Sequence, residues 1–299
     1  GRAKVMKITQ EIKAKVIDLD RRYRSSWDAR AIAHTIGGIS HQTVAVILKE
    51  ARGPRPKKIE IPHVRRTRFF FRDVMWPSDF VKLPDGRLLL KTQDEASRFR
   101  LGWRTSPSET GEAVLAHAEN IIQRMGRVPL IWKYDHGSGF LSDLFQKFLQ
   151  VNKIIPYPTQ PRAPWTNGRV ERDHQEILNW LLGVEGLGLT LDQWDREIDE
   201  GMMTLNFIKP RAVLEFKTST GTYFNMPGLE NWSETDRLHF CMNVEDLKTQ
   251  IALVKKESVH RKAVRIALEE WKLYEEWEIR PKEAGSVNRS EEKNVANWT

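Results

Sequence analysis

Three acidic residues, Asp79, Asp135 and Glu171, have the spacing and the surroundings of a shared metal site. Asp135 ends the apolar run 129–135, and Glu171 follows Asn167-Gly168 at the start of a helical pattern, with 35 residues between the two acids. Carboxylate oxygens are the ligands that Mg²⁺ or Mn²⁺ prefers, and two such ions can activate an attacking oxygen and stabilise a leaving one. Carboxylates held together repel one another, so we expect at least one raised pKa without metal. The trio predicts metal-dependent phosphodiester chemistry.

The elements that must position these residues form an alternating pattern between residues 69 and 183. Three strand-like segments come first, with a Pro-Asp-Gly hairpin signal between the first two, and helical and strand-like segments then alternate. The expected strands are 76–83, 87–92, 98–103, 129–135 and 154–157, and the expected helices are 108–126, 141–151 and 166–182. This order predicts an α/β core with one mixed five-stranded sheet and helices on both faces.

Residues 1–51 predict a small all-α domain of three helices. Gly37-Gly38-Ile39-Ser40 gives a tight turn and a good N-cap between the second helix and the third, which is typical of a helix-turn-helix. The polar residues that open the third helix, His41, Gln42 and Thr43, then stand where a recognition helix presents side chains to base edges. A generic three-helix bundle remains the alternative.

The positive charge of the chain is concentrated at its N-terminal end, which favours a polyanionic partner such as DNA. Residues 1–72 hold 18 Lys/Arg against 6 Asp/Glu, although the whole chain carries a net charge of only +8. Residues 52–68, rich in Pro and Arg/Lys, read as a basic linker or arm that tracks phosphates, with a bland linker as the alternative. Its candidate DNA contacts are Arg52, Arg55, Lys57, Lys58, Arg65, Arg66 and Arg68.

Beyond the core, the pattern is weaker. Residues 184–255 predict a mixed or β-rich C-terminal module that begins with a helical stripe, residues 256–281 predict a charged helix, and residues 282–299 predict a disordered tail. The single cysteine, Cys241, excludes a disulfide framework and any zinc site that needs several thiolates. We see no signal peptide and no run of the ~18 apolar residues that a membrane span needs, so we expect no membrane partner.

Residues 76–182 resemble the catalytic core of DDE transposases and retroviral integrases, which have a ribonuclease H-like fold. The resemblance rests on four stretches: Trp76-Pro-Ser-Asp79, Asp94-Glu-Ala-Ser-Arg98, Asp135-His-Gly-Ser-Gly-Phe140, and Pro161-Arg-Ala-Pro-Trp-Thr-Asn-Gly-Arg-Val-Glu171-Arg172. The helix-turn-helix ahead of that core resembles bacterial insertion-sequence transposases in particular. The resemblance implies an α/β ribonuclease H-like core after an all-α domain, followed by a smaller C-terminal region with a helical tail.

On that resemblance Asp79, Asp135 and Glu171 form the catalytic, metal-binding triad, and Mg²⁺ or Mn²⁺ is the cofactor, with two ions. Asp94 belongs instead to a structural stretch in which it caps or pairs locally, and Asp73 and Asp85 are expected to be solvated. The loop before Glu171 resembles a mobile active-site loop, whose expected DNA contacts are Asn167, Arg169 and Arg172. The family's later Tyr-Asn…Arg-Pro-His segment survives here only as the degenerate Leu205-Asn-Phe-Ile-Lys-Pro-Arg211.

The functional expectation is a DNA transposase, a polynucleotidyl transferase that binds terminal inverted repeats, hydrolyses a phosphodiester and joins the freed 3′-hydroxyl to target DNA. Double-stranded DNA, as element ends and as target, is the expected partner, on which the chain forms a homodimer or a higher oligomer. We expect a cytoplasmic bacterial protein, associated with the nucleoid when bound to DNA. Two alternatives remain: a DNA-binding regulator with a silent core, and a ribonuclease H-like nuclease that cuts without joining.

Overall fold

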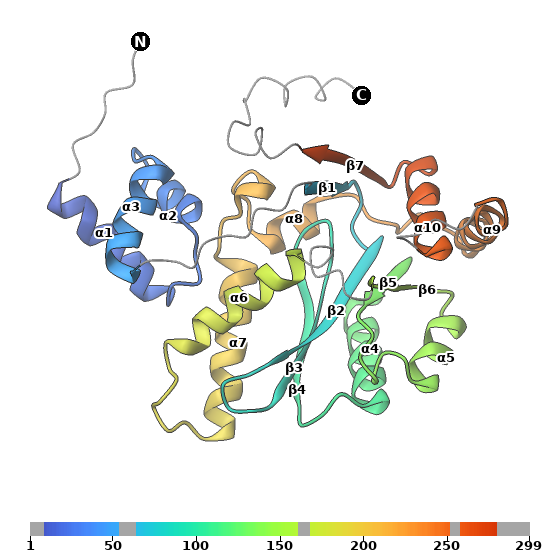
Figure 1. Ribbon diagram of the computed structural model, residues 1–299, viewed down its shortest axis with the longest axis horizontal. Helices are drawn as coiled ribbons and strands as arrows, with labels where there is room; N and C mark the ends of the chain where they lie inside the picture. The colour runs from blue at the N-terminus through green and yellow to red at the C-terminus, as the bar shows by residue number, and fades with distance from the viewer. Residues whose placement is uncertain (1–8, 54–63, 161–167, 252–257, 280–299) are drawn as a thin grey trace, which may run out of the picture.

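A computed structural model describes residues 9–53, 64–160, 168–251 and 258–279 of the chain. Its centre is a five-stranded mixed sheet with the strand order β4-β3-β2-β5-β6 (Figure 1). The strands are β2 (Met75–Lys82), β3 (Leu88–Gln93), β4 (Arg100–Ser106), β5 (Ile131–Tyr134) and β6 (Ile155–Pro158). β2, β3 and β4 are antiparallel neighbours, whereas β5 runs parallel to both β2 and β6. This is the ribonuclease H-like arrangement that the sequence predicted.

Helices cover both faces of this sheet. On one face α4 (Gly111–Met125) and α5 (Asp143–Val151) pack on aromatic residues of the strands, including Trp76 and Trp132. On the other face α6 (Gly168–Leu182) and α7 (Leu191–Phe207) pack against Val81 and Leu89. Each of α4, α5 and α7 begins at a Ser or Thr whose hydroxyl accepts a backbone N–H of the first turn, which fixes where these helices start. The predicted three-layer core is therefore confirmed.

The N-terminal region folds as three helices, α1 (Gln10–Arg22), α2 (Ala29–Ile36) and α3 (His41–Arg52). The chain changes direction by 118° between α2 and α3, within the range of a helix-turn-helix. Gly37 and Gly38 both take positive φ in this turn, and Ser40 caps α3 through a bond from the Thr43 N–H. The small core of this region includes Val16, Ile32 and other residues from all three helices.

The C-terminal region differs from its prediction, because the described residues between 211 and 251 are helical and contain no strand. A 3₁₀ turn (Ala212–Leu214) leads into α8 (Ser219–Asn225) and α9 (Glu234–Gln250). The predicted helix over 256–281 is also wrong in its second half: α10 covers Val259–Glu270, and β7 covers Tyr274–Ile279. The helix was predicted to continue because Trp277 fits the apolar spacing of α10. In β7, however, buried Tyr274 is followed by exposed Glu275, which is the alternation of a strand.

The arm predicted for residues 52–68 is likewise corrected at its end, where Val64–Phe69 form strand β1. β1 pairs antiparallel with β7, from Val64 opposite Ile279 to Phe69 opposite Tyr274. No local signal marks this pairing because its partner lies about two hundred residues later in the chain. The two strands form a ribbon of their own beside the main sheet (Figure 1).

No single helix among the described residues is both long and apolar enough to cross a membrane. The bent pair formed by α2 and α3 meets that test jointly, by length and composition alone.

Candidate active site

Asp79, which was predicted within the first strand, and Asp135, which was predicted at the end of the fourth, are neighbours in the structure. The parallel register of β2 and β5 pairs Pro77 with Lys133. Asp79 and Asp135 each stand two residues further along, so the period of the strands gives them the same face as that pair. Both residues are half-buried near the carboxyl end of β5. The structure brings these two predicted residues together.

The environment of Asp79 disfavours its negative charge. Burial first, and then repulsion from Asp135, raise the pKa of Asp79 to about 7, although Lys91 opposes this shift. The Phe80 N–H donates to Asp79 Oδ1 at 2.9 Å. His174 Nε2 lies 3.5 Å from Asp79 Oδ2, but burial and then Lys91 lower the pKa of His174 to about 3, so the ring is neutral. The raised pKa expected for one carboxylate of the site is confirmed at Asp79.

A fourth carboxylate, that of Glu109, borders the site and was not anticipated. A Cβ on Gly137 would lie 2.9 Å from Glu109 Oε2 and 3.0 Å from Asp135 Oδ1, so both carboxylates flank this glycine. The Gly137 N–H donates to Asp135 Oδ1 at 2.9 Å. Burial and then Asp135 raise the pKa of Glu109. The sequence offered no signal for Glu109, which precedes α4 in an ordinary polar loop.

The third predicted carboxylate, Glu171, lies in the first turn of α6, as predicted, but its side chain is outside the described part of the structure. Among the described residues no group of three or more His, Cys, Asp or Glu side chains is arranged to hold a metal ion. The donors that are described suit Mg²⁺ nonetheless: they are oxygens, they repel one another, and burial makes their charge costly without a cation. His174, one turn after Glu171, brings α6 against Asp79.

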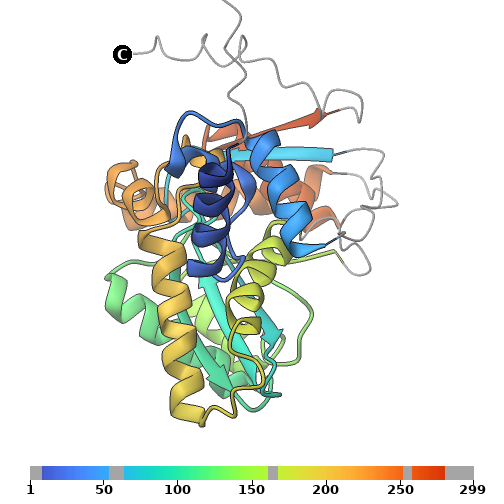
Figure 2. The same ribbon diagram turned by 90° about the vertical axis from the view of Figure 1, so that its left-hand side faces the viewer.

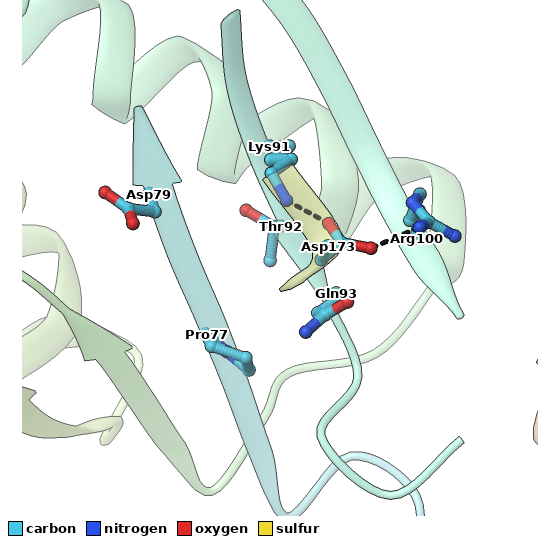
Figure 3. Close-up of a pocket in the computed structure, with 7 residues that line it drawn as sticks. All are labelled: Pro77, Asp79, Lys91, Thr92, Gln93, Arg100 and Asp173. Carbon is cyan, nitrogen blue, oxygen red and sulfur yellow. Dashed lines mark hydrogen bonds and ion pairs between the residues drawn. The ribbon is translucent and has the colours of Figure 1, made fainter. Parts of the chain in front are cut away.

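Behind Asp79 a buried ion network holds α6 to the sheet. Lys91 is the direct cross-strand partner of Asp79, and its ammonium is bonded to Asp173 of α6. The second oxygen of Asp173 accepts from Arg100 of β4. Figure 3 shows this chain of contacts beside the small cavity that Asp79 also lines, with the Asp79 carboxylate pointing away from Lys91 and Asp173. All three members of the network are buried.

The same network explains the degenerate segment 205–211. Glu176, one turn after Asp173, accepts from Arg100 at 3.0 Å and from Arg211 at 2.9 Å, and pairs with Lys209 at 3.0 Å. Burial opposes ionisation, but Arg211, Lys209 and Arg100 together hold the pKa of Glu176 well below its usual range. Asn206 adds two bonds to the backbone of Arg100. The segment therefore fastens α6 to β4.

The remaining acidic residues of the core have structural roles. Asp94 accepts the Ser97 N–H at 2.8 Å and the Asp73 N–H at 2.9 Å, which confirms the expectation of local pairing. The expectation that Asp73 is solvated is wrong, because Asp73 is 3% exposed and accepts bonds from Tyr223 and Trp76. Its partner Tyr223 comes from α8, which no local pattern could indicate.

Asp85 is not freely solvated either. Its side chain is 7% exposed and bonds Arg87 through both the backbone N–H, at 3.0 Å, and the guanidinium, at 2.7 Å. An Asp at the start of a hairpin turn commonly bonds the backbone two residues ahead in this way.

The predicted DNA contacts are placed as follows. His41 and Gln42 are exposed at the start of α3, where Thr43 is half-buried. The Arg52 guanidinium is bonded to Asp20 and to the Trp27 carbonyl. Exposed arginines among the rest are Arg66, Arg68 and Arg172. Arg55, Lys57, Lys58 and Asn167 lie outside the described residues, as do the side chains of Arg65 and Arg169.

Comparisons with known proteins find the same core. Residues 72–164 match the model of the integrase core domain. Over 196 residues the chain is 26% identical to the Gag-Pro-Pol polyprotein of squirrel monkey retrovirus, covering 59% of this chain. The match spans only about a tenth, 10%, of the length of that polyprotein.

The similar solved structures include two integrase catalytic core domains and one intasome. The catalytic core domain of BIV integrase is 19% identical, with a TM-score of 0.43, over 51% of this chain and 94% of that one. The simian T-cell lymphotropic virus intasome with PP2A regulatory subunit B56 gamma is 20% identical, with a TM-score of 0.48, over 71% and 75%. The HTLV-2 integrase catalytic core domain in complex with magnesium, in a trimeric form, is 23% identical, with a TM-score of 0.43, over 52% and 99%.

The sheet order defines a ribonuclease H-like core, and Asp79 and Asp135 give it a pair of neighbouring carboxylates. Residues 72–164, which match the integrase core domain, contain Asp79 and Asp135, and this match supports a place for the core in the superfamily of DDE transposases and retroviral integrases. Glu171 lies beyond the matched segment.

Proposed function

We propose that this protein is a DNA transposase that cuts and joins the ends of its own element. The observation that carries the proposal is the juxtaposition of Asp79, within β2, and Asp135, just after the parallel strand β5, where burial and then repulsion from Asp135 raise the pKa of Asp79 to about 7. A site of this kind gains a large favourable interaction when a divalent cation arrives. The integrase core domain over residues 72–164 supports the same reading.

The proposed reaction has two steps of one kind. In the first, water adds to a phosphorus atom at the element end while the bond from that phosphorus to the 3′-oxygen breaks, which leaves a free 3′-hydroxyl. In the second, that 3′-oxygen adds to a phosphorus of target DNA, while the bond to the target's own 3′-oxygen breaks. Two Mg²⁺ or Mn²⁺ ions would neutralise the charge that develops on the phosphate oxygens in each step. Asp79, Asp135 and Glu171 would hold them.

The chain's own residues contribute position and charge. Asp79 and Asp135 are fixed by strands, and the Asp135 carboxylate is oriented by the Gly137 N–H. α6 would carry Glu171 toward them, since His174 of the same helix already meets Asp79. The helix-turn-helix would bind the terminal inverted repeats through His41, Gln42 and Thr43, and exposed Arg66, Arg68 and Arg172 would contact phosphates. A homodimer or higher oligomer would hold two ends together.

Strand transfer with oligonucleotides that carry the element ends tests the proposal. With Mg²⁺ or Mn²⁺ the wild-type chain should release a 3′-hydroxyl end and join it to a second duplex, whereas Asp79→Asn and Asp135→Asn should do neither. Asp246→Asn, an exposed position on α9, is the matched control and should behave as wild type.

Three other results would each replace the proposal. Free ends without joined products would indicate a nuclease. Tight binding to the repeats without cleavage at any metal concentration would indicate a regulator with a silent core. Joining that survives in both active-site variants would remove Asp79 and Asp135 from catalysis.

A further inference from the structure

The turn between α1 and α2 rests on the helix that carries Glu171. Residues 23–26 form this segment, the docking turn. The Arg24 guanidinium pairs with Glu197 of α7 and lies 4.6 Å from the ring centroid of Trp180 of α6. Both views of the molecule show the three N-terminal helices beside α6 and α7 (Figures 1 and 2). The helix-turn-helix region is therefore seated on the catalytic core.

Other contacts extend the same interface. Asn179 of α6 donates to the Ser25 carbonyl at 3.5 Å. Tyr23 packs against the apolar cluster that α6 and α7 form with the sheet. His34 of α2 stacks on Phe216 with ring centroids 4.3 Å apart. The interface thus combines an ion pair, apolar packing and ring stacking, drawn from the docking turn and from α2.

Lys209 joins this interface to the buried ion network. Its ammonium donates to the Ser26 carbonyl of the docking turn at 2.7 Å and pairs with Glu176 of α6 at 3.0 Å. Asp28, the residue that caps α2, attracts both Lys209 and Arg211. Lys209 is 2% exposed, so it is enclosed by the two regions that it connects.

Enclosure makes the two contacts of Lys209 interdependent. If the docking turn left the core, the Ser26 carbonyl would be lost as a partner and water would reach the ammonium. An ion pair in water is worth much less than the same pair in a low-dielectric interior. Departure of the helix-turn-helix region would therefore weaken the hold of Lys209 on Glu176, which stands on the same helix as Glu171.

We propose that Lys209 is a positioning residue that couples docking of the helix-turn-helix region to the placement of α6, and hence of Glu171. The surface formed by Asn179, Trp180 and Glu197 is then the seat for the chain's own helix-turn-helix. The coupling rests on the proposed function, because it affects catalysis only if that region binds DNA ends and Glu171 acts on them. It makes end recognition and the completed active site parts of one rigid unit.

Hydrogen exchange on the full-length chain tests the coupling without any assay of activity. In Lys209→Met and in Arg24→Glu, the amides of residues 173–181 in α6 should exchange about tenfold faster or more, while those of α4 stay as in wild type. The double variant Arg24→Glu/Glu197→Arg restores the ion pair in reverse and should return α6 to near wild-type exchange. Lys209→Arg, which keeps the charge, should show a smaller change than Lys209→Met.

Three exchange results would contradict coupling between the docking turn and α6. Faster exchange confined to the docking turn, an equal rise in α4 and α5, or no change in α6 would each overturn the proposal. In strand transfer at saturating DNA, Arg24→Glu should lose joining, the charge-swapped variant should regain it, and affinity for the element ends should be unchanged in both. Should the wild-type chain join no DNA at all, the proposed function fails, but the exchange results still decide whether docking and α6 are coupled.

Discussion

Two pairs of acidic residues in the core have opposite electrostatic surroundings. Asp79 in β2 and Asp135 just after β5 are neighbours, and the pKa of Asp79 is raised to about 7 by burial and by Asp135. Asp173 and Glu176 are buried on α6 at least as deeply, yet the arginines and lysines around them hold the pKa of both carboxyls below the usual range despite that burial. The difference between the two pairs therefore comes from the number of basic side chains around them and not from how deeply they are buried.

The difference shows how structural and functional acids can be told apart in one core. The α6 pair is satisfied by Lys91, Arg100, Lys209 and Arg211, so it has no use for a further cation. Asp79 and Asp135, in contrast, repel each other, so a cation bound between them would be stabilised. Acidic residues of a metal site are expected to be left in this condition, because the missing positive charge is what the ion supplies.

Removing a carboxylate from the Asp79–Asp135 pair should have the largest effect of the changes considered, and that effect should be a loss of activity. Asp79→Asn is expected to lower the rate of strand transfer about 10³-fold or more, since metal-held charge is worth several kcal/mol in the transition state. The same change should raise the free energy of unfolding of the metal-free protein, because it relieves repulsion with Asp135. Oligonucleotide assays and urea denaturation measure the two effects. If Asp79→Asn were less stable than wild type and still active, Asp79 would have a structural role and not a catalytic one.

The corresponding change in the α6 pair should act on stability. Glu176→Gln leaves Arg100, Lys209 and Arg211 buried with too little negative charge, so we expect a loss of about 3–5 kcal/mol in the free energy of unfolding. Denaturation in urea measures this loss, and Glu200→Gln, an exposed position on α7, is the control. If the two variants are equally stable, the network contributes far less than its burial implies.

The pH dependence of stability should carry the signature of the raised pKa values. Asp79 and Asp94 both have a pKa of about 7 in the folded chain, against 3.8 for an unperturbed aspartate, so between about pH 4 and 7 the folded state binds more protons than the unfolded state. Their contribution is full below pH 4 and is lost as the pH rises through 7. Each group accounts for up to about 1.4 kcal/mol per pH unit.

Unfolding of the metal-free protein in urea across this range measures the slope. Asp79→Asn should make the slope shallower, and saturating Mg²⁺ should do the same in the wild type if the ion binds the ionised carboxylates. Identical slopes in wild type and Asp79→Asn would show that Asp79 titrates normally.

The smallest effect is expected where both partners of an ion pair face water. Lys153 and Glu234 form such a pair, with side chains 43% and 77% exposed. Because solvent screens it, Lys153→Met should change the free energy of unfolding by less than about 1 kcal/mol. Thermal denaturation at two salt concentrations would measure it. A loss near that of Glu176→Gln would mean that exposure is a poor guide to the worth of these pairs.

Much of the core could be predicted from the sequence, because its signals are local. The strands and helices from residue 75 to 182 have apolar periods, caps and turns that mark them within a few residues. Asp79 was identified within a predicted strand and Asp135 at the end of another, both inside short motifs. Asp94 was correctly separated from them, since its partners Ser97 and Asp73 include a near neighbour in the chain.

The remainder depends on contacts between distant segments. Asp73 was expected to be solvated because its partner Tyr223 lies 150 residues away. Lys209 and Arg211 looked like remnants of a family motif, and only the fold reveals that they neutralise Glu176. The strand β7 was missed for the same reason, since its pairing with β1 leaves no periodic mark in the intervening sequence.

That pairing of β1 with β7 also constrains the order in which the protein can be completed during translation. Val64 finds its partner Ile279 only after 215 further positions have left the ribosome. The five-stranded sheet, which ends at Pro158, can assemble much earlier. Until then β1 is a strand with an open edge, a state that invites pairing with other chains. A nascent or truncated chain that stops before Tyr274 should therefore be more prone to aggregation than the finished one.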